Sequence, residues 1–241
     1  MDFEKGCYKI ERTGNLDMGF DYYAPQSFLD AHGNRVMIAW QNGWLWMPWC
    51  QDWGPAGEEG WRGTLSIPRK VSLNEEHHLC LCPVRELELL EGEPEEYFDY
   101  EVTEGRQHFY PKDAKSYRME LWIDTEKVDS RYLEIGVLGK GEKATVVTAD
   151  LVGKVVSLDK SRGDTYGRGR MNCPVEIRNG KCKLMILVDH STVEVYVDDG
   201  RYCMTSNVYP EKEPVECWIG TPYKSGVIDR VRISSLKKFW E

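Results

Sequence analysis

The chain has 241 residues and a formal net charge of −9, a length that suits one or two domains with a sizeable core. The acidic balance argues against nucleic acid and anionic membrane as partners, because both require clustered Lys and Arg. No apolar run approaches the ~20 residues that span a bilayer and residues 1–10 lack the apolar stretch of a signal peptide, so we expect a cytoplasmic protein.

Two strand candidates open the chain. Residues 16–28 crowd acids, aromatics and an amide together, and residues 35–40 form an apolar run that ends in Trp40. A sugar offers hydroxyls to carboxylate and amide groups and a C–H face to an aromatic ring, so this pair suits the wall of a sugar site. The alternative is a strand whose aromatics belong to a core. Asp17 precedes Gly19 at a position typical of a turn.

A tryptophan-rich stretch follows over residues 40–55, and its Gly and Pro residues indicate a loop. Exposed indoles reduce solubility, so we expect them to be covered by protein or by ligand. For Trp40, Trp44, Trp46 and Trp49, lining of a substrate site and packing in a core or interface are both open.

A domain boundary is predicted near residue 90. Residues 83–90 are the one candidate for a short helix, because Pro can open a first turn. Residues 91–96 are acidic, contain Gly and Pro and lack apolar residues, which is typical of a solvated linker.

The whole chain otherwise reads as strands of alternating apolar and polar residues with frequent turn signals, the pattern of all-β propellers and sandwiches. Residues 31–34 join two strand candidates. Asn179-Gly180 and Asp199-Gly200 supply the positive φ values that tight hairpins require.

The polar residues of the second half are interpreted as structural. Asp189 and Glu194 alternate with valines, as on the solvated face of a strand. His108 and His190 lie in strand-like contexts and are not expected to be catalysts. The basic residues within 160–170 can either bind a phosphate or pair with the acidic surplus of the surface.

Eight cysteines are scattered without a Cys-x-x-Cys pair, which favours reduced, mostly buried thiols. A metal site on Cys80 and Cys82 with His77 and His78 is the disfavoured alternative, because zinc sites usually space cysteines two to four residues apart. We expect no metal ion and no cofactor.

Several ordered blocks of this sequence resemble glycoside hydrolase family 32, which contains the invertases, levanases and sucrose-6-phosphate hydrolases. The blocks are LDMGFDYYAPQSF at 16–28, RVMIAW at 35–40, EGWRGTLSIPR at 59–69, CPVREL at 82–87, SLDKSR at 157–162 and LVDHSTVEVYVDDG at 187–200. The resemblance implies the last blade of a five-bladed β-propeller followed by a C-terminal β-sandwich.

The resemblance also implies boundaries. Residues 1 to about 15 would be the outer edge of blade four and residues 16 to about 88 blade five, so 1–90 form a partial propeller. Residues 96–241 would be the sandwich. A blade without its neighbours exposes apolar faces and strand edges. We therefore expect self-association through 1–90, or docking on an N-terminal half made separately.

The resemblance implies a fructoside as ligand. Asp21 would accept hydrogen bonds from a fructose or glucose hydroxyl, Gln26 would donate and accept others, and Tyr23 with Trp40 would form the apolar wall. For Asp21, a carboxylate that supports a turn or strand pairing is the alternative. Family members cleave β-fructofuranosyl bonds with retention, using two carboxyl groups and no metal.

No catalytic residue is expected in this chain. The family's Asn-Asp-Pro-Asn and Arg-Asp-Pro motifs do not occur, and its Glu-Cys motif has only Glu216-Cys217 as a counterpart, far downstream in the sandwich region. We expect the C-terminal portion of a fructosidase, inactive alone and most similar to bacterial sucrose-6-phosphate hydrolases. The alternative is a non-catalytic module that binds carbohydrate or assists assembly.

Overall fold

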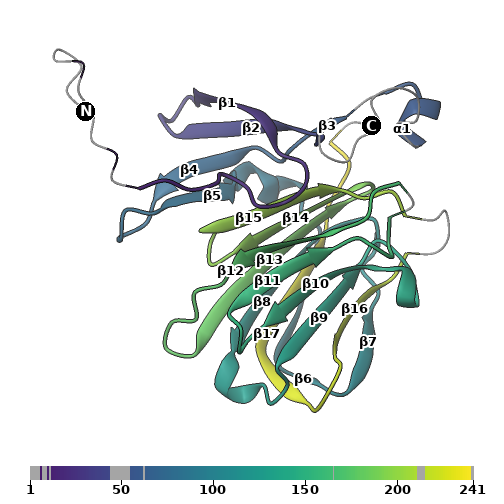
Figure 1. Cartoon of the computed structure of the whole chain (residues 1–241). Helices are drawn as coiled ribbons and strands as arrows, with labels where there is room; N and C mark the ends of the chain where they lie inside the picture. The colour runs from purple at the N-terminus through teal and green to yellow at the C-terminus, as the bar shows by residue number, and fades with distance from the viewer. Residues whose placement is uncertain are drawn as a thin grey trace.

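The computed structural model describes residues 6, 10, 12–43, 55–61, 63–164, 166–210 and 215–239. Within these ranges the chain forms three antiparallel sheets, one of which lies across the top of the other two (Figure 1). The prediction of an all-β protein is confirmed. Helix is restricted to short turns. These are α1 (Pro55–Glu58), η1 (Arg85–Leu90), η2 (Thr125–Lys127) and η3 (Gly141–Lys143). None of them has the length and apolarity needed to cross a membrane.

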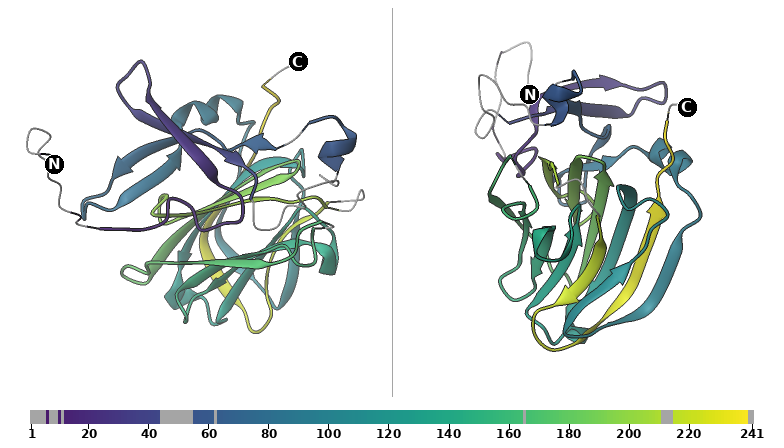
Figure 2. Two further views of the ribbon diagram at one scale, coloured as in Figure 1. Left: turned by 45° about the horizontal axis from the view of Figure 1, so that its top comes forward. Right: turned by 90° about the vertical axis from the view of Figure 1, so that its right-hand side faces the viewer.

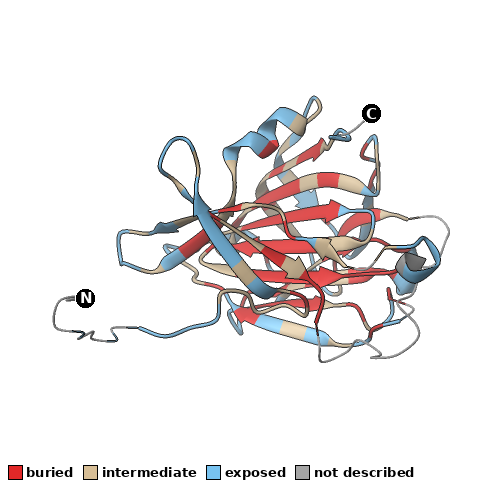
Figure 3. Cartoon of the chain, turned by 90° about the horizontal axis from the view of Figure 1, so that it is seen from above, coloured by how far each residue is buried: buried red, intermediate tan, exposed pale blue. Residues whose placement is uncertain are grey.

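The first sheet contains the N-terminal strands and resembles a propeller blade in its simple up-and-down order. Its path is β1 (Tyr23–Leu29), β2 (Arg35–Gln41), β4 (Arg69–Leu73) and β5 (Leu79–Pro83), with β3 (Thr64–Leu65) paired to β2. We call this the blade sheet. Its strand β1 is exposed at nearly every position and crosses over the buried sandwich strands (Figure 3).

The other two sheets form the sandwich (Figure 2). The outer sheet runs β12 (Arg170–Pro174), β11 (Val155–Asp159), β10 (Thr145–Asp150), β9 (Tyr132–Val137), β16 (Cys217–Thr221) and β7 (Gly105–Phe109). The blade-side sheet runs β15 (Tyr202–Asn207), β14 (Thr192–Val197), β13 (Lys181–Asp189), β8 (Ser116–Asp124), β17 (Gly226–Ser235) and β6 (Glu95–Val102).

The sandwich core is built from alternating apolar residues on the facing sides of its two sheets. Residues such as Leu121, Leu133, Ile135 and Leu184 are fully buried in one continuous cluster. A smaller second cluster lies between the blade sheet and the blade-side sheet, and it includes Leu81. The sandwich therefore has its own core, whereas the blade sheet shares one.

The predicted turns are confirmed, although an isolated bridge between Arg178 and Lys181, and not a pair of full strands, closes the turn at Asn179-Gly180. Asn179 and Gly180 have φ values of 50° and 76° in the turn before β13, and Asp199 and Gly200 have 52° and 77° between β14 and β15. Gly33 has φ 79° between β1 and β2. Positive φ is favourable for Gly and tolerated by Asn and Asp, so local chemistry places these turns.

Two local predictions need correction. The first strand begins at Tyr23, because residues 16–22 instead lie against β15, where the N–H groups of Met18 and Phe20 donate to Cys203 and Thr205 carbonyls. The predicted linker is not fully solvated. The Glu91 side chain is 6% exposed, because it bridges Arg118 and Arg232. The predicted short helix is present as the 3₁₀ helix η1.

The six described cysteines are free thiols, as expected. Burial raises the pKa of Cys82 to about 11 and that of Cys217 to about 12. These thiols are therefore protonated and poorly nucleophilic at neutral pH.

Candidate functional site

The first hairpin of the blade sheet brings two of the predicted site residues together. Tyr23 and Trp40 lie opposite each other in the β1–β2 register, and their rings meet edge to face with centroids 6.3 Å apart. Tyr23 is 47% exposed and Trp40 is half-buried. Gln26 is exposed on the same strand, opposite Ile38. The structure thus presents an aromatic pair and an amide on the outer hairpin of the blade.

Gly63 makes the position of Trp40 possible. A Cβ on this residue would lie 2.0 Å from the Trp40 Nε1 atom, so the indole occupies the space that any side chain would need. Gly63 also has φ 72°, which disfavours other residues. Both observations explain the glycine in the GWRGT block.

Asp21 is separated from this pair. It is fully buried between the blade sheet and the sandwich, where its carboxylate accepts a hydrogen bond from the Asn207 N–H at 2.8 Å. Lys160 Nζ lies 4.0 Å from Asp21 and 3.3 Å from Asp164, and donates to the Asn207 carbonyl. The geometry of Asp21 matches the alternative of a structural carboxylate. Lys160 therefore pairs with carboxylates, which is one of the two roles predicted for the basic residues within 160–170.

A second and larger polar network holds the blade sheet against the sandwich. Arg69 begins β4 and is fully buried, with Nη1 2.9 Å from Asp17 and Nη2 2.6 Å from Glu194. Its guanidinium lies between two aromatic rings, 4.6 Å from the centroid of Tyr22 and 4.9 Å from that of Tyr196. One cation thus joins the N-terminal segment, the blade sheet and strand β14.

The carboxylate of Glu194 completes this network. Besides Arg69 it accepts hydrogen bonds from Gln41 Nε2 at 2.7 Å and from the Ile67 N–H at 2.8 Å. Burial raises the pKa of Tyr196 well above its usual value and that of Tyr22 to about 12. Both phenols are therefore neutral at physiological pH, and the Tyr196 hydroxyl donates a hydrogen bond to Glu194.

The prediction that Glu194 lies on a solvated face is wrong. It is 2% exposed, because the blade sheet covers the outer face of β14 and every residue from Val193 to Val197 is buried. Asp189, the other residue of that prediction, is exposed at the end of β13. The predicted Asp17–Gly19 turn is confirmed by a 2.8 Å bond, although Asp17 also binds Arg69.

Sequence reasoning assigned no role to Arg69 or to Gln41. The only available signal was an arginine directly after a proline at the start of an otherwise ordinary strand. Its burial depends on contacts with residues more than a hundred positions away, such as Glu194 and Thr205.

Large apolar side chains of the blade sheet are exposed. Phe28 is 54% exposed, Leu29 59%, Leu65 64% and Leu73 63%. The strand register places Phe28 and Leu65 on the outer face with Trp40, whereas Leu29 and Leu73 lie on the face of Val71, which is turned toward the sandwich. Exposed apolar side chains on the outer face are typical of an interaction surface. Trp44, Trp46 and Trp49 lie outside the described residues, so their predicted contribution is not placed.

Family comparison accounts for both parts of the chain. The model of the glycosyl hydrolases family 32 N-terminal domain matches residues 1–83, and the model of the family 32 C-terminal domain matches residues 86–234. The chain belongs to glycosyl hydrolase family 32. The division between the two family models falls at the end of the blade sheet, between β5 and η1.

Relatives within the family include proteins that act on sucrose derivatives. The chain is 30% identical over 208 residues to a sucrose-6-phosphate hydrolase of Zymomonas mobilis, covering 83% of this chain and 38% of the relative. It is also 30% identical over 201 residues to a raffinose invertase of Escherichia coli, covering 82% and 39%. The chain therefore spans about two fifths of the length of these relatives.

Solved family structures show the same fold. The exo-inulinase of Aspergillus awamori superposes with a TM-score of 0.79 at 20% identity, covering 97% of this chain and 46% of that one. The sucrose-6-phosphate hydrolase of Lactobacillus gasseri gives 0.73 at 21%, covering 92% and 43%. The likeness in family 32 extends over the blade sheet and the sandwich together.

Proposed function

We propose that these residues form the closing blade of a five-bladed propeller and the trailing sandwich of a retaining β-fructofuranosidase acting on sucrose or sucrose-6-phosphate. The exposed apolar side chains on the outer face of the blade sheet carry this proposal. Phe28 and Leu65 would pack against a neighbouring blade in a complete ring and are 54% and 64% exposed here. The carboxyl pair that cleaves the bond would come from the other blades.

In this arrangement the blade contributes to substrate binding. The aromatic edge of Tyr23 and Trp40 would border the fructose ring, where C–H groups can pack on the ring faces. Gln26 is exposed on the same hairpin and can exchange hydrogen bonds with sugar hydroxyls. The substrate is held by this chain and attacked by groups outside these 241 residues.

The buried network gives the sandwich a role in the same function. Because Arg69 and Glu194 connect the blade sheet to β14, the sandwich fixes the angle at which the blade meets its neighbours. A rigid scaffold of this kind is needed when reacting groups must be positioned to within a fraction of an ångström.

Reconstitution tests this function directly. Hydrolysis of sucrose, sucrose-6-phosphate and inulin would be measured with the chain alone and after addition of an N-terminal half taken from a family 32 relative. We expect no turnover alone and measurable turnover with the added half. Turnover by the chain alone would contradict the assignment of the carboxyl pair to other blades. Inactivity of a folded, stoichiometric complex would favour a non-catalytic carbohydrate-binding or assembly module.

The exposed face also sets the expected assembly. In the absence of an N-terminal half, burial of the blade's apolar residues requires a second copy, so light scattering should report a dimer or larger species. A monomer at micromolar concentration would contradict self-association. Replacement of Phe28 and Leu65 by Ser is expected to shift the population toward monomer.

A further inference from the structure

The outer sheet of the sandwich carries a hollow of about 300 Å³ on the side away from the core. Strands β9, β10 and β16 form its floor, with Val146, Thr148 and Trp218 pointing outward because their neighbours in sequence point into the core. Charged residues form its rim. These are Arg106, Arg162, Arg170, Glu134, Glu142 and Asp159. The volume lies at the lower end of the range for small-molecule sites.

Some of the charged side chains on this rim form ion pairs with one another, and others do not. Arg106 and Arg162 both bind Glu142, at 2.6 and 2.7 Å. The side chains of Glu134 and Arg170 form no hydrogen bond or ion pair with any residue in the described part of the chain. Burial raises the pKa of Glu134, and the charges of Arg106 and Arg170 partly oppose this rise. An acceptor and a donor of opposite charge thus face the same hollow unpaired.

Trp218 supplies a third unpaired group. The residue is 1% exposed, and its Nε1 atom has no hydrogen-bond acceptor among the described residues. The indole lies flat over Gly136, where a Cβ would be 2.1 Å from Nε1, and the Arg106 guanidinium covers the ring at 4.7 Å. Gly136 pairs with Val146 on the next strand, so the N–H edge lies on the β9 side, beside the hollow.

The charges of the rim distinguish between ligand classes. Its three arginines are balanced by three carboxylates, so the lining carries no net positive charge to hold a phosphate. Sugar hydroxyls both donate and accept hydrogen bonds, which matches an unpaired carboxylate beside a guanidinium and an indole N–H. Buried polar groups without partners are rare and unfavourable, and a polyhydroxyl ligand would satisfy them.

We propose that this hollow is a saccharide-binding site on the sandwich, separate from the blade, in which Glu134 accepts hydrogen bonds from sugar hydroxyls while Arg170 and Trp218 donate them. The site is on the outer sheet, which the blade sheet does not contact through its β-strand pairing. It does not depend on the proposed hydrolysis, because it uses no residue of the blade.

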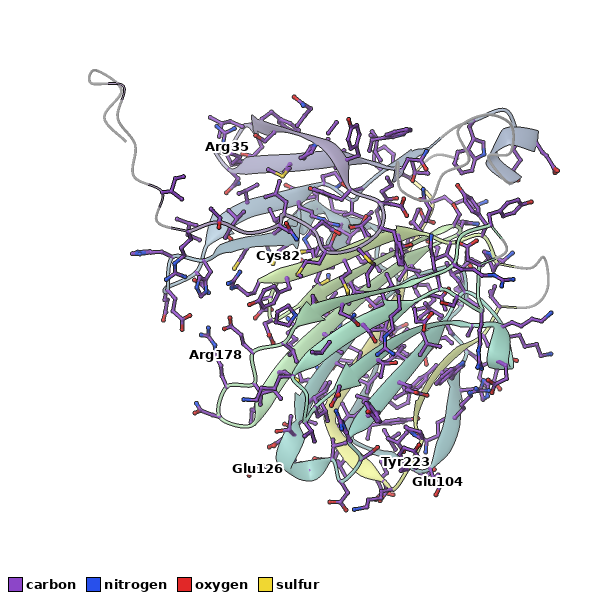
Figure 4. The ribbon with its side chains drawn as sticks, in the orientation of Figure 1. Arg35, Cys82, Glu104, Glu126, Arg178 and Tyr223 are labelled. Carbon is purple, nitrogen blue, oxygen red and sulfur yellow. The ribbon has the colours of Figure 1, made fainter. Side chains whose placement is uncertain are left out.

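Calorimetric titration of the whole chain with 1-kestose, sucrose and inorganic phosphate tests the site. The informative variants are Glu134→Gln, Arg170→Gln and Trp218→Phe, the last of which keeps the ring and removes the N–H. Matched controls are Glu104→Gln, at the end of the sandwich away from the blade (Figure 4), and Arg85→Gln, whose side chain is 91% exposed on η1. Tyr23→Ala reports on binding at the blade.

Saccharide binding that weakens about tenfold in the Glu134 and Arg170 variants, and not in the controls, is the expected result, because one hydrogen bond to a charged group contributes on that order. Three results would overturn the proposal. These are no binding of either sugar, binding reduced only by Tyr23→Ala, and phosphate binding that replaces sugar binding at the same residues. If Trp218→Phe unfolds the chain, the Glu134→Gln and Arg170→Gln variants still test the proposal.

Discussion

The sandwich and the blade sheet are both antiparallel β-structure, yet they obtain their stability in different ways. The sandwich buries a single apolar cluster between two six-stranded sheets, with residues such as Ile135 and Leu184 fully enclosed. Among the described residues, the blade sheet is covered on one face only, and a buried cation with two carboxylates joins it to the N-terminal segment and to β14. The comparison shows that one region is self-sufficient, whereas the other depends on its neighbours.

The two regions also differ in where their polar side chains lie. In the sandwich most polar side chains lie on the outer faces of the sheets and in the turns. At the junction with the blade, Arg69, Glu194, Asp21 and Lys160 are all almost completely inaccessible. Ionic junctions of this kind lose stability sharply when one partner is removed, because the remaining charge stays buried without compensation. They also specify a single relative orientation of the parts they join.

The largest effect is expected for Arg69→Ala. The substitution leaves Asp17 and Glu194 buried without a cation, which should lower the free energy of unfolding by about 3–5 kcal/mol. Urea unfolding monitored by tryptophan fluorescence measures the change. The exposed Arg85→Ala is the control and should change stability by less than about 0.5 kcal/mol. Equal effects of the two variants would show that the junction contributes little.

A leucine in each region provides the sharpest contrast. Leu184→Ala in the sandwich core should cost about 2–5 kcal/mol, because it leaves a cavity in a fully packed region. Leu65→Ala removes a side chain that is 64% exposed and should cost less than about 0.5 kcal/mol in the monomeric chain. In a self-associated species or in the reconstituted complex, Leu65→Ala should instead weaken association. A large loss of stability from Leu65→Ala in the monomeric chain would contradict the one-sided burial of the blade.

Gly63→Ala tests the aromatic edge of the blade. The added methyl group would collide with the Trp40 indole and occupy a left-handed backbone conformation, with an expected loss of about 1–3 kcal/mol. Gly33→Ala is a matched control for the backbone conformation alone, because its Cβ would enter open space. A change in tryptophan fluorescence with Gly63→Ala and not with Gly33→Ala is the expected signature.

The smallest effect concerns acid stability at the start of the sandwich. Burial raises the pKa of Glu91, but hydrogen bonds and charges from Arg232 and Arg118 outweigh it and hold the pKa below its usual 4.5. A depressed carboxyl pKa contributes stability above the unfolded-state value, and this contribution is lost as pH falls through the folded-state value. Glu91→Gln should therefore cost about 1–2 kcal/mol at neutral pH.

The difference between wild type and Glu91→Gln should shrink as pH falls below about 4.5, where the carboxyl of the unfolded state is protonated first, and it should vanish below the lower pKa of the folded state. Urea unfolding at a series of pH values measures it. Glu93→Gln is the control, since Glu93 is an exposed glutamate two residues away. A constant difference across the acid range would exclude the ion pairs of Glu91 as its cause.

Local sequence chemistry was sufficient for the all-β class and for the hairpin turns. Asn179-Gly180 and Asp199-Gly200 place positive φ values by their own steric preferences, and strand alternation depends on immediate neighbours. The ordered motif blocks were sufficient for the family. Tyr23 and Trp40 were correctly brought together, because adjacent antiparallel strands joined by a short loop must face each other.

The sequence by itself determined the all-β class, the positions of the tight turns and the family, because these depend on residues close together in the chain. Tertiary structure alone decided that Glu194 is buried, that Asp21 supports a junction and that Arg69 joins two sheets. A strand with one polar face has the same alternation whether that face meets water or another sheet. Only the packing of the blade sheet on β14 determines which charges are removed from solvent and must be paired.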